Sequence, residues 1–374
     1  MRAMWVLVLS LLLVSAMAQL PSQDILALLE FKKGIKHDPT GFVVSSWNEE
    51  SIDFDGCPSS WNGIVCNSGS VAGVVLDNLG LSADVDLNVF SNLTKLAKLS
   101  LSNNSITGKF PDNIAEFQSL EFLDISNNLF DSSLPQEIGK LTSLQNLSLA
   151  GNNFSGSIDP IVGLQSIRSL DLSRNSFSGP LPTALTKLTN LVYLDLSLNG
   201  FTKSIPKGFE LISDLKVLDL HGNMLVGTLD VEFFMLSGAT HVDFSSNMLT
   251  SSDTEHGKFL PRLSDTIKYL NLSRNQLTGS LVNGGELSLF ENLKTLDLSY
   301  NQLSGELPGF SFVYELQILK LSNNRFSGDI PNNLLKGDAS VITELDLSAN
   351  NLSGTNLILA TLVNIITSFL CSLT

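Results

Sequence analysis

The chain has 374 residues, of which 43% are hydrophobic, so it is long enough to bury a large core. Its formal net charge is -15 at pH 7, which argues against nucleic acid and against an anionic membrane surface as partners, because both require a basic surface. No long acidic run concentrates this charge, so a self-repelling, soluble surface is the simplest interpretation.

Residues 1–18 have the features of a secretory signal peptide. Arg2 supplies a positive charge, residues 4–14 are apolar apart from Ser10, and residues 16–18 (AMA) have the small-x-small pattern of a cleavage site. A signal anchor that stays in the membrane is the alternative, but the apolar stretch is shorter than the roughly 20 residues that a span requires. We therefore expect cleavage and folding in an oxidising compartment.

Residues 19–70 are expected to cap the N-terminal end of the fold. Within them, residues 24–36 (DILALLEFKKGIK) place Ile25 and Leu28 at the spacing of an amphipathic helix. Asp24 stands directly before the apolar positions and is the expected N-cap. A helix of this kind is predicted to lie across the open end of the structure that follows.

A close pair of cysteines, Cys57 and Cys66, stands in the segment CPSSWNGIVC. In a secreted chain such a pair is most simply a disulfide, and no histidine is placed nearby to complete a zinc site. Together with Trp47 and Trp61, this bridge is expected to cover apolar side chains that would otherwise be exposed at the end of the fold.

From Val71 onward the sequence repeats every 23 to 28 residues, and most units read L-x-x-L-x-L-x-x-N-x-L-x-G-x-L/I-P. Twelve units occur in register over residues 71–354. They start at Val71, Leu96, Leu120, Leu144, Ile167, Leu191, Leu215, Ala239, Ile267, Leu293, Leu316 and Ile342. A repeat of this length and pattern predicts a leucine-rich-repeat solenoid, in which every coil buries its leucines against its neighbours.

The ninth position of the repeat is an asparagine in eleven units, and only the first unit departs, with Leu79 there. We expect this side chain to turn inward and to bond backbone groups of its own coil and of the next, which would otherwise be buried without partners. The role is therefore structural. The residues are Asn104, Asn128, Asn152, Asn175, Asn199, Asn223, Asn247, Asn275, Asn301, Asn324 and Asn350.

The segments LLEFKKGI, SSWN and CPSSWNGIVC, with Gly-x-Ile/Leu-Pro at residues 179–182 and 328–331, resemble the ectodomains of plant leucine-rich-repeat receptor-like kinases. A closer likeness, carried by residues 19–43 and 50–67, is to a receptor-like pseudokinase of guard cells. The resemblance implies an α/β solenoid of the plant extracellular type: a curved, superhelical horseshoe with a parallel concave sheet, a second strand on its flank, and the helical, disulfide-bonded cap.

The same resemblance implies a plasma-membrane receptor that signals in stress, with one transmembrane helix and a kinase-like domain inside the cell. Its expected partner is a peptide ligand or the leucine-rich-repeat ectodomain of a co-receptor. No kinase motif follows the repeats here, so we expect no enzymatic activity and no cofactor. Residues 355–374 form a non-repeat apolar tail, for which truncation is the first expectation and a weak membrane tail or a lipid-anchor signal are the alternatives.

The concave face is the default binding surface of a solenoid. Its candidate ligand-binding residues, read from the strand positions, are Arg168, Arg174, Tyr193, Lys216, His221, His241, Tyr269, Arg274 and Tyr300. The aspartate of the recurring L-D-L-S segment is interpreted as repeat consensus. His221 and His241 fall in offset positions of adjacent coils, so no metal site is predicted.

Six N-x-S/T sequons are candidate glycosylation sites: Asn92, Asn103, Asn146, Asn153, Asn271 and Asn351. Glycans at Asn103, Asn146 or Asn271 would lie on or beside the concave face and restrict ligands to the middle coils. The alternative to a receptor ectodomain is a secreted decoy or a protein similar to the inhibitors of polygalacturonase. That family normally ends in a second cysteine pair, which this chain lacks.

Overall fold

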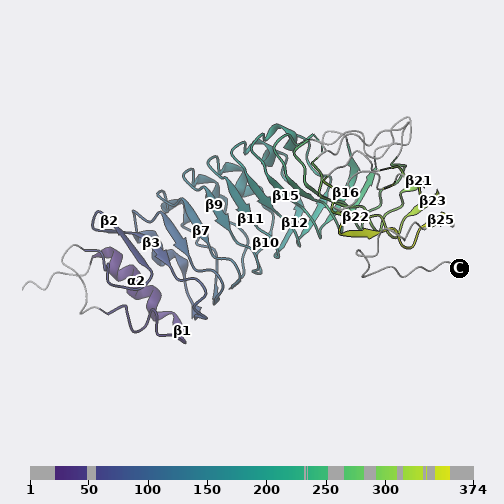
Figure 1. Cartoon of the computed structure of the whole chain (residues 1–374). Helices are drawn as coiled ribbons and strands as arrows, with labels where there is room; N and C mark the ends of the chain where they lie inside the picture. The colour runs from purple at the N-terminus through teal and green to yellow at the C-terminus, as the bar shows by residue number, and fades with distance from the viewer. Residues whose placement is uncertain are drawn as a thin grey trace, which may run out of the picture.

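The computed structural model describes residues 22–48, 56–230, 233, 235–251, 265–281, 292–309, 315–331, 334 and 342–353. The predicted signal peptide at 1–18 and the predicted apolar tail at 355–374 lie outside these residues. Successive coils stack along one axis into an elongated, curved solenoid, with the N-terminal helix at one end and the last coils at the other (Figure 1).

A 13-stranded sheet runs the length of the solenoid. Its first pair, β2 (Ile64–Asn67) and β3 (Ser70–Val75), is antiparallel, and every later pair is parallel. Each of the twelve units expected from the sequence contributes one strand. After β3 these are β5 (Lys98–Ser100), β7 (Phe122–Asp124), β9 (Asn146–Ser148), β11 (Ser169–Asp171), β13 (Tyr193–Asp195), β15 (Val217–Asp219), β17 (His241–Asp243), β19 (Tyr269–Asn271), β20 (Thr295–Asp297), β22 (Ile318–Lys320) and β24 (Glu344–Asp346).

A second set of strands lies on the flank, as the Gly-x-Ile/Leu-Pro segments predicted. It forms three shorter sheets in the described residues, with strand orders β1-β4-β6-β8, β10-β12-β14-β16-β18 and β21-β23-β25. Their bounds are β1 (Ile35–His37), β4 (Ser82–Asp84), β6 (Ser105–Gly108), β8 (Leu129–Phe130), β10 (Ser155–Gly156), β12 (Ser176–Pro180), β14 (Gly200–Lys203), β16 (Met224–Leu229), β18 (Met248–Ser251), β21 (Ser304–Glu306), β23 (Arg325–Asp329) and β25 (Asn351–Ser353).

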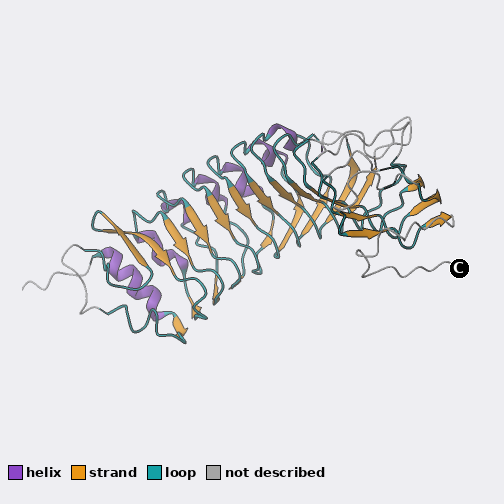
Figure 2. Cartoon of the chain, in the orientation of Figure 1, coloured by secondary structure: helices purple, strands orange, loops and turns teal. Residues whose placement is uncertain are grey.

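The side opposite the long sheet carries short 3-10 helices, drawn in purple in Figure 2. These are η2 (Leu87–Asn92), η3 (Ile114–Glu116), η4 (Gln136–Lys140), η5 (Asp159–Gly163), η6 (Thr183–Lys187) and η7 (Phe209–Leu211). A coil of about 24 residues that also holds two strands leaves room for only about one helical turn. Neighbouring turns approach closely, and a Cβ on Gly163 would lie 2.4 Å from the carbonyl oxygen of Gly139. The helical contribution to the α/β class is therefore small.

The cap helix α2 spans Gln23–Lys33 and ends at Gly34. The expected N-cap was wrong: Ser22 holds that position, and its hydroxyl accepts the N–H of Ile25 at 3.3 Å. Asp24 instead lies in the first turn, where its carboxylate accepts the N–H of Val71, the first residue of the repeats, at 2.8 Å. This bond fastens the cap directly to the first coil.

Aromatic side chains and the disulfide close the N-terminal end, as expected. Cys57 and Cys66 are bonded, with their Cα atoms 6.1 Å apart. Trp47 and Trp61 are almost completely buried and stack with 5.5 Å between ring centroids and 14° between ring planes. Phe31 of α2 continues this layer toward the repeats. The prediction of a helical, disulfide-bonded cap is confirmed.

The role of the recurring repeat asparagine is clear at Asn128. Its Nδ2 donates to the carbonyl oxygens of Leu101, Ile125 and Ser126 at 2.9, 3.2 and 3.1 Å, and its Oδ1 accepts the N–H of Ile106 at 3.0 Å. The inward turn and the structural role are as expected. The neighbour is the preceding coil, not the next one, because Leu101 and Ile106 come one unit earlier in the chain.

Candidate ligand-binding face

The long sheet is in register, so equivalent residues of successive coils stand in rows across the concave face. The first residues of four neighbouring strands form what we call the strand-start row: Tyr193, Val217, His241 and Tyr269. The last residues of four strands form the aspartate row: Asp171, Asp195, Asp219 and Asp243. The backbones of neighbouring residues in a row lie about 4.8 Å apart, which is the spacing between paired strands.

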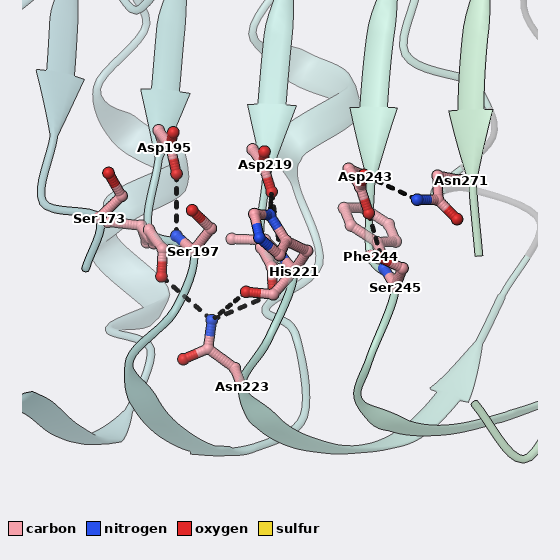
Figure 3. A network of polar contacts seen from close by, with 12 residues as sticks. Ser173, Asp195, Ser197, Asp219, His221, Asn223, Asp243, Phe244, Ser245 and Asn271 are labelled. Atoms are coloured by element: carbon pink, nitrogen blue, oxygen red, sulfur yellow. Dashed lines mark hydrogen bonds and ion pairs between the residues drawn. The ribbon is translucent and has the colours of Figure 1, made fainter. Parts of the chain in front are cut away.

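The aspartate row closes the turn that follows each strand. In all four coils the aspartate Oδ1 accepts the backbone N–H of the residue two positions later, at 2.9 or 3.0 Å. Figure 3 shows Asp195, Asp219 and Asp243 side by side at the ends of their strands. This bond explains why an aspartate recurs in the repeat and supports the interpretation of these residues as repeat consensus.

The row also concentrates negative charge in a partly buried place. Burial raises the pKa of Asp171, and the charges of Asp195 and Asp124 add to this against the hydrogen bonds from Ser173. Burial likewise raises the pKa of Asp219 to about 6, and the charge of Asp195 adds to it against the bonds and charge of His221. The concave face thus has an acidic centre that favours a positively charged group.

Two histidines meet this acidic centre. His221 Nδ1 lies 2.8 Å from Asp219 Oδ1, within the turn that follows β15. The His241 ring stacks flat on Tyr269, with 4.0 Å between centroids and 3° between planes. Burial lowers the pKa of His241, although the charges of Asp243 and Asp195 oppose this effect.

Asp243 is held from the neighbouring strand β19. Its Oδ2 accepts the phenol O–H of Tyr269 at 3.2 Å and Nδ2 of Asn271 at 2.9 Å. Burial raises the pKa of Tyr269 to about 12, and the charge of Asp243 contributes to the same shift. Within strand β13, Tyr193 donates to Asp195 Oδ2 at 3.2 Å, and burial followed by the charge of Asp195 raises the pKa of Tyr193.

The remaining candidates lie at the two borders of these rows. Arg168 and Lys216 directly precede β11 and β15 and are exposed; Lys216 Nζ donates to the carbonyl oxygen of Gly238 at 3.1 Å. Arg174 lies at the opposite border, in the turn that follows β11. It is exposed and has a positive φ of 54°.

Arg274 and Tyr300 occupy the turn position equivalent to Arg174 in later coils, with φ of 55° each. The Arg274 guanidinium lies over the Tyr300 ring, 4.2 Å from its centroid. The structure therefore brings together His241 and Tyr269 in the centre, with His221 beside Asp219, and Arg274 with Tyr300 at one border. That these residues contact a ligand remains a prediction.

Sequence reasoning missed Asp219 and Asp243 as partners of His241. One ligand atom from each of these three side chains lies within 4.8 Å of the others. A signal was present, since four successive units carry an aspartate at the same position and one of them has a histidine two residues earlier. The signal is weak, because the same aspartate also has a structural reason to recur.

The six sequons differ in exposure. Asn92, Asn103, Asn153 and Asn351 are exposed, whereas Asn146 in β9 and Asn271 in β19 are partly buried. Glycosylation of these sequons remains a prediction, and the hydrogen bonds made by the Asn271 amide argue against it at that site.

Family models match most of the repeat region. The model described as Leucine rich repeat N-terminal domain matches residues 21–67, and two models described as Leucine rich repeat match residues 76–130, 94–154 and 165–225, and residues 266–285, 292–311 and 315–336. Among relatives, the LRR receptor-like serine/threonine-protein kinase GHR1 of Arabidopsis thaliana is 70% identical over 349 residues, which are 93% of this chain and 33% of that protein. The chain therefore spans about a third of the length of this relative.

Solved structures of plant receptors have the same fold. The structure of PEPR1–AtPEP1 has a TM-score of 0.73 and 28% identity, covering 88% of this chain and 49% of that one. The Arabidopsis receptor kinase HAESA, in complex with the peptide hormone IDA and the co-receptor SERK1, has a TM-score of 0.69 and 27% identity, covering 89% of this chain and 62% of that one. These matches confirm the likeness to plant receptor ectodomains. None of the helices in the described residues has the length and apolar character needed to cross a membrane.

Proposed function

Because this chain belongs to the leucine-rich-repeat proteins and shares 70% identity with a plant receptor-like kinase, we propose that it is the extracellular ligand-binding part of such a receptor, acting in signal transduction at the plasma membrane. The kinase activity in the relative's name belongs to that longer protein. The present chain holds the leucine-rich repeats, and we assign it binding and no catalysis of its own.

One observation supports the proposal. The repeat pattern does not specify the outward-facing strand positions, and on the concave face several of these positions hold aromatic or charged side chains. The strand-start row holds Tyr193, His241 and Tyr269 in adjacent or near-adjacent coils, and Arg168 and Arg174 border the coil before the first of these. A purely structural repeat needs no aromatic side chains at these outward positions. Tyrosine and arginine are the residue types that most often anchor a protein interface.

An extended peptide fits this surface best. An extended peptide that crosses the strands would pass one strand about every 4.8 Å. The four coils of the strand-start row would therefore contact a stretch of about four or five residues. The similar receptors PEPR1 and HAESA are solved with peptides bound, and HAESA also with the co-receptor SERK1. We infer a peptide ligand on the concave face, with a co-receptor ectodomain as a second partner.

The proposal is tested by capturing the ligand. The purified chain is immobilised and exposed to peptides extracted from plant extracellular fluid, and the retained peptides are identified by mass spectrometry, resynthesised and titrated by calorimetry. We expect at least one peptide to bind with one-to-one stoichiometry and to lose affinity in the double variant Tyr193→Ala, Tyr269→Ala. If no peptide is retained, or if this variant binds unchanged, the concave face is not a peptide site.

A further inference from the structure

Asp219, His241 and Asp243 converge on one point of the concave face. The sheet register pairs Asp219 with Asp243, so their side chains stand side by side on adjacent strands. His241 lies two residues before Asp243, and side chains two apart in a strand point to the same face. As a result, one oxygen from each carboxylate and one ring nitrogen lie within 4.8 Å of one another.

The donor set suits a divalent first-row transition metal. Zinc and similar ions bind imidazole nitrogen and carboxylate oxygen at about 2.0–2.2 Å, often with three protein ligands and one water. Such bonds place neighbouring ligand atoms about 3.3 Å apart, so the three side chains have to close by small rotations while the backbone stays in place. Calcium, which takes six to eight oxygens, finds only two carboxylates here.

Other residues already hold the two carboxylates in orientation. His221 Nδ1 lies 2.8 Å from Asp219 Oδ1, while Tyr269 and Asn271 donate to Asp243 Oδ2 at 3.2 and 2.9 Å. Bonds of this kind, from a second layer of residues to the ligands, are characteristic of metal sites and tune their affinity.

The third donor is oriented by stacking, and it is free to bind. The face-to-face contact with Tyr269 fixes the plane of the His241 ring. Within the described residues, neither ring nitrogen of His241 makes a hydrogen bond, and no lysine or arginine forms an ion pair with Asp219 or Asp243. A cation at this point would bind a ring nitrogen of His241 and offset the repulsion between the carboxylates of Asp219 and Asp243.

We propose that Asp219, His241 and Asp243 bind a divalent transition-metal ion of the zinc class on the concave face, with His221 and Asn271 as positioning residues. All three ligands come from strands β15 and β17, and none of them is replaced in the variant that tests peptide binding. The metal site and the peptide-binding function are therefore tested by different variants, and either proposal can fail without the other.

The test is a titration of the untagged chain with Zn²⁺, followed by calorimetry, in the wild type and in His241→Gln and Asp219→Asn. The matched control is Asp297→Asn, because Asp297 ends β20 and bonds the following turn in the same way but has no histidine beside it. We expect one Zn²⁺ per chain, with binding weakened by about tenfold or more in either site variant and unchanged in the control.

A second readout identifies the nitrogen ligand. With Cu²⁺ in place of Zn²⁺, the electron paramagnetic resonance spectrum should show coupling to one imidazole nitrogen, which His241→Gln removes and His221→Gln retains. Circular dichroism of each variant verifies that it is folded. Absence of one-to-one binding, equal loss in Asp297→Asn, or nitrogen coupling that survives His241→Gln would each overturn the proposed site.

Discussion

The side-chain amide of Asn247 donates to the carbonyl oxygen of Leu220, one coil earlier, at 3.0 Å. The same nitrogen also reaches the carbonyls of Phe244 and Ser245, and Oδ1 accepts the N–H of Leu225. One buried side chain thus satisfies four backbone groups of two coils. This contact joins the coils in a way that leucine packing alone cannot, because burying a backbone polar group without a partner is costly.

Replacing Asn247 by alanine is therefore expected to destabilise the middle of the solenoid by about 2–4 kcal/mol. Urea unfolding followed by circular dichroism measures this. The matched control is Asn190→Ala, which removes one exposed bond, to the carbonyl of Gln165, and should cost less than about 1 kcal/mol. Equal effects of the two substitutions would show that burial of the asparagine does not matter.

The Cys57–Cys66 bridge is expected to stabilise the cap by constraining a short loop. For a closed loop of about ten residues, the chain-entropy estimate is about 2–3 kcal/mol. The double variant Cys57→Ser, Cys66→Ser should accordingly lower the unfolding midpoint. Hydrogen exchange should show the loss in α2 and β3 first, since each coil contacts only its neighbours. Exchange that increases equally in β20 and β22 would contradict a local role for the bridge.

The repeats and the cap could be predicted because their signals are local. The spacing of leucines within one unit already sets which side chains point inward, and the CPSSWNGIVC segment is consistent with a disulfide by proximity alone. The error at Asp24 has a different origin. Either Ser22 or Asp24 is a good N-cap residue in isolation, and only the contact between Asp24 and Val71, 47 residues later, decides between them.

The cluster of Asp219, His241 and Asp243 could not be predicted from the sequence as readily as the repeats and the cap. Asp219 and His241 are 22 residues apart and become neighbours only through the register of β15 and β17. Unit lengths vary between 23 and 28 residues, so a fixed period does not give that register in every coil. In addition, the aspartate has a structural reason to recur, and this hides any second use of the oxygen that does not bond the turn.

Asp38 is expected to make the stability of the cap depend on acidic pH. Burial raises its pKa, but the N–H bonds from Val44, Val43 and Phe42 outweigh this and leave the pKa below its usual value. Because the folded-state pKa is depressed, the stabilisation is complete above the ordinary value of 3.8 and is lost as the pH falls through the lower folded value.

The corresponding experiment compares thermal unfolding of the wild type and Asp38→Asn between about pH 7 and pH 3. The variant should be less stable near neutral pH by about 1 kcal/mol, and the difference should shrink in acid. Asp112→Asn, which changes an exposed carboxylate, serves as the control. A difference that stays constant down to pH 3 would show that the three N–H bonds do not depend on the charge.

Asn271 is expected to carry little or no glycan, although it lies in a sequon. Its amide nitrogen donates to Asp243 Oδ2 at 2.9 Å and to the Tyr269 hydroxyl at 3.3 Å, and a sugar on that nitrogen would crowd both contacts. The exposed Asn92 and Asn351 have room for a glycan. Mass spectrometry of glycopeptides from the chain secreted by plant cells measures the occupancy. High occupancy at Asn271 would mean that the acidic centre of the face is rearranged or covered.

Reversing charge at Arg168 and Arg174 is expected to weaken binding of the captured peptide. Both side chains are exposed at the borders of the same coil, on either side of the aspartate row, and are placed to pair with acidic groups of a ligand that crosses it. The double variant Arg168→Glu, Arg174→Glu should raise the Kd by about tenfold or more, mainly through slower association, and the effect should diminish in high salt. The control Lys109→Glu reverses a single charge just beyond flank strand β6, away from the concave face. If the double variant and the control bind equally well, the ligand contacts other coils, and Arg274 and Tyr300 become the next pair to replace.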